Sequence, residues 1–237
     1  MRPHGATMAG TVMDFIRILR SLEELLYELM TWIILYPRTL WRSAVSPLGM
    51  LRYSQREVTD TLEEQYTETL SPVLFLMLTL ALSHYVSLLI LPASPETHGM
   101  MKRLMSSEQN QLITRSVAFA IFPLVYASQQ VRREGHLLDR NTLRPPFFGQ
   151  CFPVAVFSLT LAVSSIMLRL NGEWFRHLGV VAAIASIAWY VVVQARWLRE
   201  YHSAGRWLAA GLSLWGFAKA SAIVTMAALA LSRININ

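Results

Sequence analysis

Residues 71–91 read SPVLFLMLTLALSHYVSLLIL, a stretch of 21 residues without an acidic or basic side chain other than one histidine. A helix needs about 20 predominantly apolar residues to cross the hydrocarbon core of a bilayer, so this stretch predicts a transmembrane helix. Ser71 is suited to capping that helix, and Pro72 suits its first position, where the amide hydrogen that proline lacks would have no partner.

Four further apolar segments follow, at about 112–128, 150–168, 178–195 and 207–232. Each is near the length of a span, although the segment 112–128 is short and contains Pro123. The connections between them carry residues typical of turns, namely Pro92, Pro95, Pro145-Pro146, Asn171-Gly172 and Gly205. The sequence therefore predicts an all-α, polytopic membrane bundle of about five transmembrane helices over 71–237, preceded by a polar segment over 1–70.

The composition agrees with a membrane protein. The chain is 54% hydrophobic and 15% charged, with a mean hydropathy of +0.37, whereas soluble domains carry about 25% charged residues. The net charge is +6; because many arginines flank apolar stretches and no long basic run occurs, we expect membrane lipids and no nucleic acid as partners. A single cysteine, Cys151, excludes an intramolecular disulfide and a cysteine-based metal centre within one chain, and we expect no cofactor.

The segment 12–35 predicts an amphipathic helix. Apolar residues recur at alternating steps of three and four, and polar residues fall on the opposite face. The five charges between Arg17 and Glu28 make it a poor spanning helix, and the uncharged stretch Leu29–Tyr36 is too short to cross a bilayer. We therefore expect a helix that lies on the membrane surface or against the bundle and ends at Pro37.

An acidic stretch over 54–70, SQREVTDTLEEQYTETL, predicts a short solvent-facing helix, because Val58, Leu62 and Tyr66 recur every four residues. Its charged side chains form either a solvated face or a docking surface for a basic partner. The docking candidates are Glu57, Asp60, Glu63, Glu64 and Glu68.

The distribution of basic residues predicts the orientation. If the N-terminus is cytoplasmic, the inner segments hold fourteen arginines and the outer segments hold five lysines and arginines. Positive charge is enriched in cytoplasmic loops, so we expect a cytoplasmic N-terminus and an external C-terminus. Arginine outnumbers lysine 19 to 2, a bias common in GC-rich bacteria, which favours a bacterial inner membrane.

Four side chains within the apolar segments could form a polar site. Lys219 lies in the middle of the fifth segment, and a charge at that depth is costly unless it faces the bundle interior, a cavity or a ligand. His84 lies at a similar depth in the first segment, with Tyr85 beside it, and Arg115 enters the second. Together these residues predict a path for an anion or a proton; alternatively, His84 bonds a carbonyl group and Lys219 snorkels or is neutral.

The layout resembles the Yip-domain family of five-span membrane proteins, which includes bacterial members described as permease-like. The local resemblance is YPRTLWRSAVSPLGM, in which Pro37, Thr39, Trp41 and Pro47 are similar to the proline-containing stretch before the first span of bacterial members. The D-L-Y-G-P-like motif of eukaryotic members is missing. The resemblance implies a five-helix membrane domain and a permease-like role, and it implies no particular reaction.

Three hypotheses follow for the function. The first is a non-enzymatic, permease-like protein that transports a small or lipid-like solute or assists its transport. The second is a membrane scaffold that recruits a protein or organises lipids, and the third is an integral-membrane enzyme acting on lipid, although no catalytic motif is recognisable. Small residues at packing spacing, such as Gly179 and Ala183, also fit a homo-oligomer or a partner membrane subunit.

Overall fold

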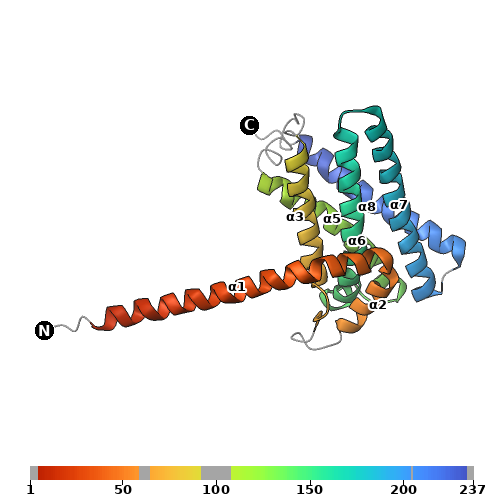
Figure 1. Cartoon of the computed structure of the whole chain (residues 1–237). Helices are drawn as coiled ribbons and strands as arrows, with labels where there is room; N and C mark the ends of the chain where they lie inside the picture. Colours follow the sequence, from red (N-terminus) through yellow and green to blue (C-terminus); the bar gives the residue numbers. More distant parts are fainter. Residues whose placement is uncertain (1–4, 59–64, 92–107, 204, 234–237) are drawn as a thin grey trace.

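The computed structural model describes residues 5–58, 65–91, 108–203 and 205–233. Within these ranges the protein is all-α, with seven helices (Figure 1). They are α1 (Gly5–Val45), α2 (Pro47–Glu57), α3 (Pro72–Ile90), α5 (Glu108–Arg133), α6 (Arg140–Arg169), α7 (Glu173–His202) and α8 (Arg206–Arg233).

Five of these helices, α3, α5, α6, α7 and α8, are long and apolar enough to cross a membrane. This confirms the predicted fold class and the five spans. The helices extend beyond the apolar segments at several ends, since α5 starts at Glu108 and α6 starts at Arg140. Hydropathy marks the part of a helix that fits the hydrocarbon, and the helices continue past it into the interface.

Helix α6 is the centre of the bundle. It packs against α3, α5 and α7, and 61% of its most apolar stretch is buried, against 33% or less in the other four spans. Aromatic side chains fill the core around it: the rings of Phe157 and Tyr190 stack with centroids 4.8 Å apart, and Phe122 and Phe217 close around them. Helix α8 packs on α5 and α7 at the side of the bundle.

Two breaks that the sequence predicts at prolines are absent from the structure, because both helices continue through them. Helix α1 continues through Pro37 to Val45, since its last turns are tied to the bundle by Thr39, whose hydroxyl accepts a hydrogen bond from the Leu70 amide at 3.2 Å. The pair Pro145-Pro146 lies inside α6 and not in a loop. That helix starts early because Asp139 forms a capping box with Thr142.

The predicted acidic helix over 54–70 is also different. Helix α2 ends at Glu57, and Gln65–Glu68 form turns, with Tyr66 in the left-handed region at φ 60°. Tyr66 is buried, and its hydroxyl lies 3.0 Å from that of Ser54, so the chain has to fold back on α2 at this point. The four-residue spacing of Val58, Leu62 and Tyr66 therefore does not reflect one continuous helix; Leu62 lies outside the described residues.

Helix α1 leaves the bundle. Figure 1 shows α1 crossing the bundle at a steep angle to α3, α6 and α7, at the end where α2 lies, and then continuing outward. Its side chains from Leu19 to Met30 are exposed, whereas Thr39 and Ser43 are fully buried against the bundle. At ~1.5 Å per residue, the part before Thr31 projects by about 40 Å.

Candidate functional site

Lys219 does not lie in an enclosed cavity. It is half-buried on α8, and its ammonium nitrogen lies 5.8 Å from the centre of the Trp215 ring, one helical turn earlier. The Trp215 side chain is itself 61% exposed. No carboxylate within the described ranges forms an ion pair with Lys219. The ammonium group is therefore held by a cation–π contact on the outer side of the bundle.

His84 and Tyr85 point in different directions on α3. His84 is 3% exposed, whereas Tyr85 is 53% exposed, and their ring centroids are 5.7 Å apart. A buried ring and an exposed ring on neighbouring residues cannot line the same side of a helix. The two side chains are thus not combined in one site.

Arg115, unlike the other three predicted residues, lines a small cavity inside the bundle. The cavity has a volume of about 160 Å³ between α3, α5 and α6. Its polar lining, besides Arg115, consists of Ser83, Ser158 and Ser165. The four residues expected to form a polar path are therefore not brought together: Arg115 lines this cavity, His84 lies on the buried side of α3, Tyr85 lies on its exposed side, and Lys219 lies beside Trp215 on α8.

The acidic docking candidates that the structure describes are engaged within the chain. Glu57 accepts a hydrogen bond from the backbone amide of Tyr66. Glu68 pairs with Arg42 at 3.4 Å and with Arg38 at 4.0 Å; the side chains of Glu68 and Arg38 are largely exposed, and that of Arg42 is partly buried. Asp60, Glu63 and Glu64 lie outside the described residues. Burial raises the pKa of the neighbouring Tyr66 to about 12, so this tyrosine is neutral at physiological pH.

Glutamines inside the spans form contacts that the sequence analysis did not single out. Gln194 of α7 donates to Gln150 of α6 at 2.5 Å, and both side chains are at most 1% exposed. Trp197 donates to Gln130 of α5 at 3.2 Å. A polar residue inside an apolar segment was the available signal, because a buried amide needs a partner on a neighbouring helix.

Helix α1 carries two opposite stripes. The apolar stripe consists of Leu22, Leu26, Leu29, Ile33, Pro37, Trp41 and Ala44, and the charged stripe contains Arg17, Arg20, Glu24, Glu28, Arg38 and Arg42. Arg38 and Arg42 bind Glu68, in the turn that follows α2. Ala44, almost half a turn of the helix away from Arg42, lines a groove between α6 and α7. The apolar stripe thus faces the side of α1 on which the spans lie.

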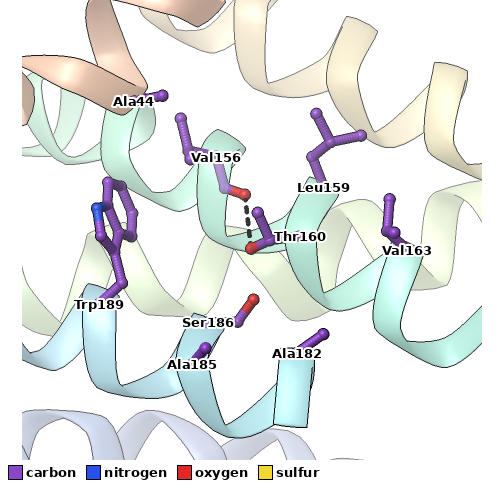
Figure 2. A pocket seen from close by; sticks show the side chains of 9 residues that line it. All are labelled: Ala44, Val156, Leu159, Thr160, Val163, Ala182, Ala185, Ser186 and Trp189. Carbon is purple, nitrogen blue, oxygen red and sulfur yellow. Dashed lines mark hydrogen bonds between the residues drawn. The ribbon is translucent and has the colours of Figure 1, made fainter. Parts of the chain in front are cut away.

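The α6–α7 groove is an apolar hollow on the side of the bundle (Figure 2). It has a volume of about 510 Å³ and is lined by Ala44, Val156, Leu159, Thr160, Val163, Ala182, Ala185, Ser186 and Trp189. The small side chains come from one face of α7, as Figure 2 shows, and they leave the space empty. At the end marked by Ala44 and Trp189, the groove meets a second hollow, of about 440 Å³, which contains Arg52 and Arg196.

This end of the bundle is rich in arginine. We call it the arginine-rich end; it comprises α2, the connection from α5 to α6 and the connection from α7 to α8, with Arg52, Arg56, Arg132, Arg133, Arg140, Arg144, Arg196, Arg199 and Arg206. The opposite ends of α6 and α7 carry Arg169 and Arg176. Among the described residues, no cluster of three or more His, Cys, Asp and Glu side chains could hold a metal ion, and Cys151 is fully buried.

These features define a multi-pass α-helical membrane protein with an amphipathic helix that extends away from the bundle. No known protein-family model, curated protein or solved structure matches the chain. Five helices are long and apolar enough to cross a membrane, and these comparisons identify no family, so they do not support the resemblance to the Yip-domain family.

Proposed function

We propose that this protein is a non-enzymatic membrane scaffold that organises lipids at one membrane surface. In this proposal α1 lies in the interface, with its apolar stripe in the hydrocarbon and its charged stripe in water. The observation that carries the proposal is the pair of contacts at the base of α1. Glu68 binds the charged stripe on one side, and the α6–α7 groove meets Ala44 on the other.

The rotation of α1 follows from these contacts. In a continuous helix, the direction of each side chain is determined by its position number, at ~100° per residue. Leu22, Leu26 and Ile33 are 50%, 52% and 73% exposed, so the protein itself does not cover them. An amphipathic helix with exposed apolar residues on one face and charges on the other binds at a membrane interface.

The proposal includes an orientation and a location. We place the arginine-rich end, at which α1 crosses the bundle, on the cytoplasmic side of a bacterial inner membrane, because positive charge is enriched in cytoplasmic loops. Anionic lipids in that leaflet would attract the same arginines. Protease or dye accessibility of tags at the two termini of the full chain tests it; the same side for both tags would contradict an odd number of spans.

Site-directed labelling of the full chain tests the position of α1. Leu26→Cys and Glu24→Cys are made in a Cys151→Ala background, labelled with an environment-sensitive fluorophore and reconstituted in phosphatidylglycerol–phosphatidylcholine vesicles. We expect the label at position 26 to be quenched by brominated lipid and the label at position 24 by aqueous iodide. Equal quenching of both labels by iodide would refute an interfacial helix, and excimer formation at position 26 would assign the stripe to a second copy instead.

A matched pair of insertions tests the rotation argument. Two alanines inserted after Met30 turn the upstream helix by about 200° and should exchange the quenching pattern, whereas four alanines turn it by about 40° beyond a full circle and should preserve it. If both insertions leave the pattern of the parent chain, the base of α1 does not determine its rotation.

A permease-like function is a second candidate, and the cavity at Arg115 is the observation in its favour. The guanidinium group of Arg115 can pair with a small anion in this cavity, whereas the hydroxyls of Ser83, Ser158 and Ser165 already donate to backbone carbonyl oxygens. Currents across supported membranes after a phosphate concentration jump test this candidate. Arg115→Gln should abolish the currents and Lys219→Ala should preserve them, because Lys219 does not line the cavity; currents that survive Arg115→Gln would exclude this site.

A further inference from the structure

We propose that the α6–α7 groove and the arginine-bearing hollow beside it form one binding site for a single anionic phospholipid. Its phosphate group would lie at Arg196 and Arg52, and one acyl chain would lie along the groove. This extends the proposed scaffold function with a defined lipid class. It uses residues and a readout different from those of the α1 test, so either idea can fail alone.

The first argument is continuity. Ala44 and Trp189 line both hollows, so the apolar space between the spans leads directly to the arginines. The groove runs along α6 from Val156 to Val163, which corresponds to about 10 Å of helix. Its lining is almost wholly apolar, with Thr160 already bonded to the carbonyl oxygen of Val156 at 3.0 Å (Figure 2). An acyl chain needs no polar partner in such a space.

The second argument is charge. Arg52 forms an ion pair with Glu200. No carboxylate in the described part of the chain pairs with Arg196, which lines both the hollow beside the groove and a further opening that contains Arg199 and Glu200. Three guanidinium groups therefore face one carboxylate. An anion at Arg196 would balance this excess, and phosphate accepts guanidinium hydrogen bonds with favourable geometry.

The third argument is depth. Arg52 lies in α2, and Arg196 lies near the end of α7 that follows the apolar part of the span. Arginines at such positions reach headgroups, while Trp189, half-buried where the two hollows meet, marks the change from interface to hydrocarbon. The groove extends from this level toward the opposite end of α6, from Val156 to Val163, which is the direction that an acyl chain takes from its headgroup.

A lipid fits the site better than a helix of a second copy. The small residues Ala182 and Ser186 have the spacing that allows close helix packing. A second helix in the groove, however, would provide no anion for Arg196. The phospholipid satisfies both parts of the site, and the second copy is the competing outcome in the experiment.

Native mass spectrometry of the full chain, released from nanodiscs of phosphatidylglycerol or of phosphatidylcholine, tests the proposal. We expect one phosphatidylglycerol retained per chain, and about tenfold weaker retention in Arg196→Gln, because hydrogen bonds to charged groups typically contribute that much. Arg196→Lys should keep part of the preference. Ala185→Leu, which fills the groove, should weaken retention of both lipids.

Two variants are the controls. Arg206→Gln removes an arginine at the same end, and Ala218→Leu enlarges an exposed small residue on α8; neither residue lines the groove or the hollow, so both should retain phosphatidylglycerol. Each variant is first checked for an unchanged melting temperature. Displacement of the lipid by millimolar inorganic phosphate would show that only the anion is recognised.

Three results would overturn the proposal. One is equal retention of phosphatidylglycerol by Arg196→Gln and the parent chain. Another is unchanged retention in a folded Ala185→Leu chain. The third is a dimer that Ala185→Leu converts to a monomer, because this would assign the groove to a second copy. The quenching of labels on α1 should be the same in Arg196→Gln, so the two proposals are distinguishable.

Discussion

The hydrogen bond between Gln150 and Gln194 provides a quantitative test of how the bundle is held together. Both amides are buried between α6 and α7. Replacing either glutamine by leucine leaves the other amide in an apolar interior, which costs about 1–3 kcal/mol. Replacing both removes the unpaired group at similar side-chain volume, so Gln150→Leu/Gln194→Leu should cost less than the sum of the single substitutions.

The coupling energy follows from this difference. Interhelical hydrogen bonds in membranes average about 0.6 kcal/mol and reach about 1.7 kcal/mol in double-mutant cycles. Because this contact is short and fully buried, we expect a coupling at the upper end of that range, about 1–1.5 kcal/mol. Reversible unfolding in mixed micelles of a mild detergent and dodecyl sulfate measures the free energy of unfolding for all four chains of the cycle.

A second cycle controls for general loosening of the bundle. Gln150→Leu is combined with Gly211→Ala, a distant exposed position where an added methyl group meets nothing within 4 Å. These two effects should add to within about 0.5 kcal/mol. If the glutamine substitutions also add without coupling, the contact contributes nothing of its own, and the structural interpretation is wrong.

Three further predictions concern packing and titration. Gly179→Ala should lower the free energy of unfolding by about 1–3 kcal/mol, because the new methyl group would approach the backbone nitrogen of Leu168 to 2.9 Å. Gly211→Ala should raise the free energy of unfolding by about 0.5–1 kcal/mol, because alanine favours the helix more than glycine does. Unfolding in mixed micelles measures both, and equal effects would contradict the close approach of α6 and α7. Burial holds the pKa of Tyr66 at about 12, against about 10 in the unfolded chain. The contribution of Tyr66 to stability is therefore complete below pH 10 and is lost toward pH 12. The melting temperature of Tyr66→Phe should lack this loss, and an equal loss in the variant and the parent chain would refute the prediction. Hydrogen bonds from the backbone amides of α6 hold the pKa of Asp139 below its usual value. The contribution of Asp139 to stability is therefore present above about pH 4 and is lost as the pH falls further. Asp139→Asn should weaken the fall of the melting temperature at acid pH, and an unchanged fall would exclude the cap as its source.

The five spans could be predicted from the sequence because lipid imposes a simple length and polarity requirement. The positions of the helices relative to one another could not. Inside a membrane, lipid-facing and protein-facing surfaces are both apolar, so hydropathy does not say that α6 is central. The pair Pro145-Pro146 was assigned to a loop for a related reason: local preference indicates a break, but Asp139 starts the helix before the prolines and the bundle keeps it intact.

Lys219 shows the same limitation in the candidate site. The cost of a charge in hydrocarbon predicted that it faces the interior. Helix α8 instead turns Ser213, Gly216 and Ala220 toward the bundle, and an alanine-sized side chain at Gly216 would approach Tyr126 to 2.8 Å. Once those small residues determine the rotation of α8, Lys219 has to lie beside Trp215 at the edge of the packed face. Small residues occur on both sides of α8, since Gly211, Ala218 and Ala222 are exposed, so neither their spacing nor the one charge revealed the packed side from the sequence.

Helix α1 combines both lessons, because its proposed interfacial role depends on its rotation, and the contacts that determine this rotation lie at its base, far from the exposed apolar residues. Thr39 and Ser43 fix one side of the helix against the bundle, and Arg42 fixes another side against Glu68. The remaining side can meet water, lipid or a second copy of the chain, and the residues that α1 presents there are apolar for more than six turns. Water would leave them exposed at an energetic cost, whereas the interface buries them at no cost in hydrogen bonds. In the proposed arrangement the bundle anchors and orients α1, and a lipid in the groove beside its base would meet Arg52 and Arg196.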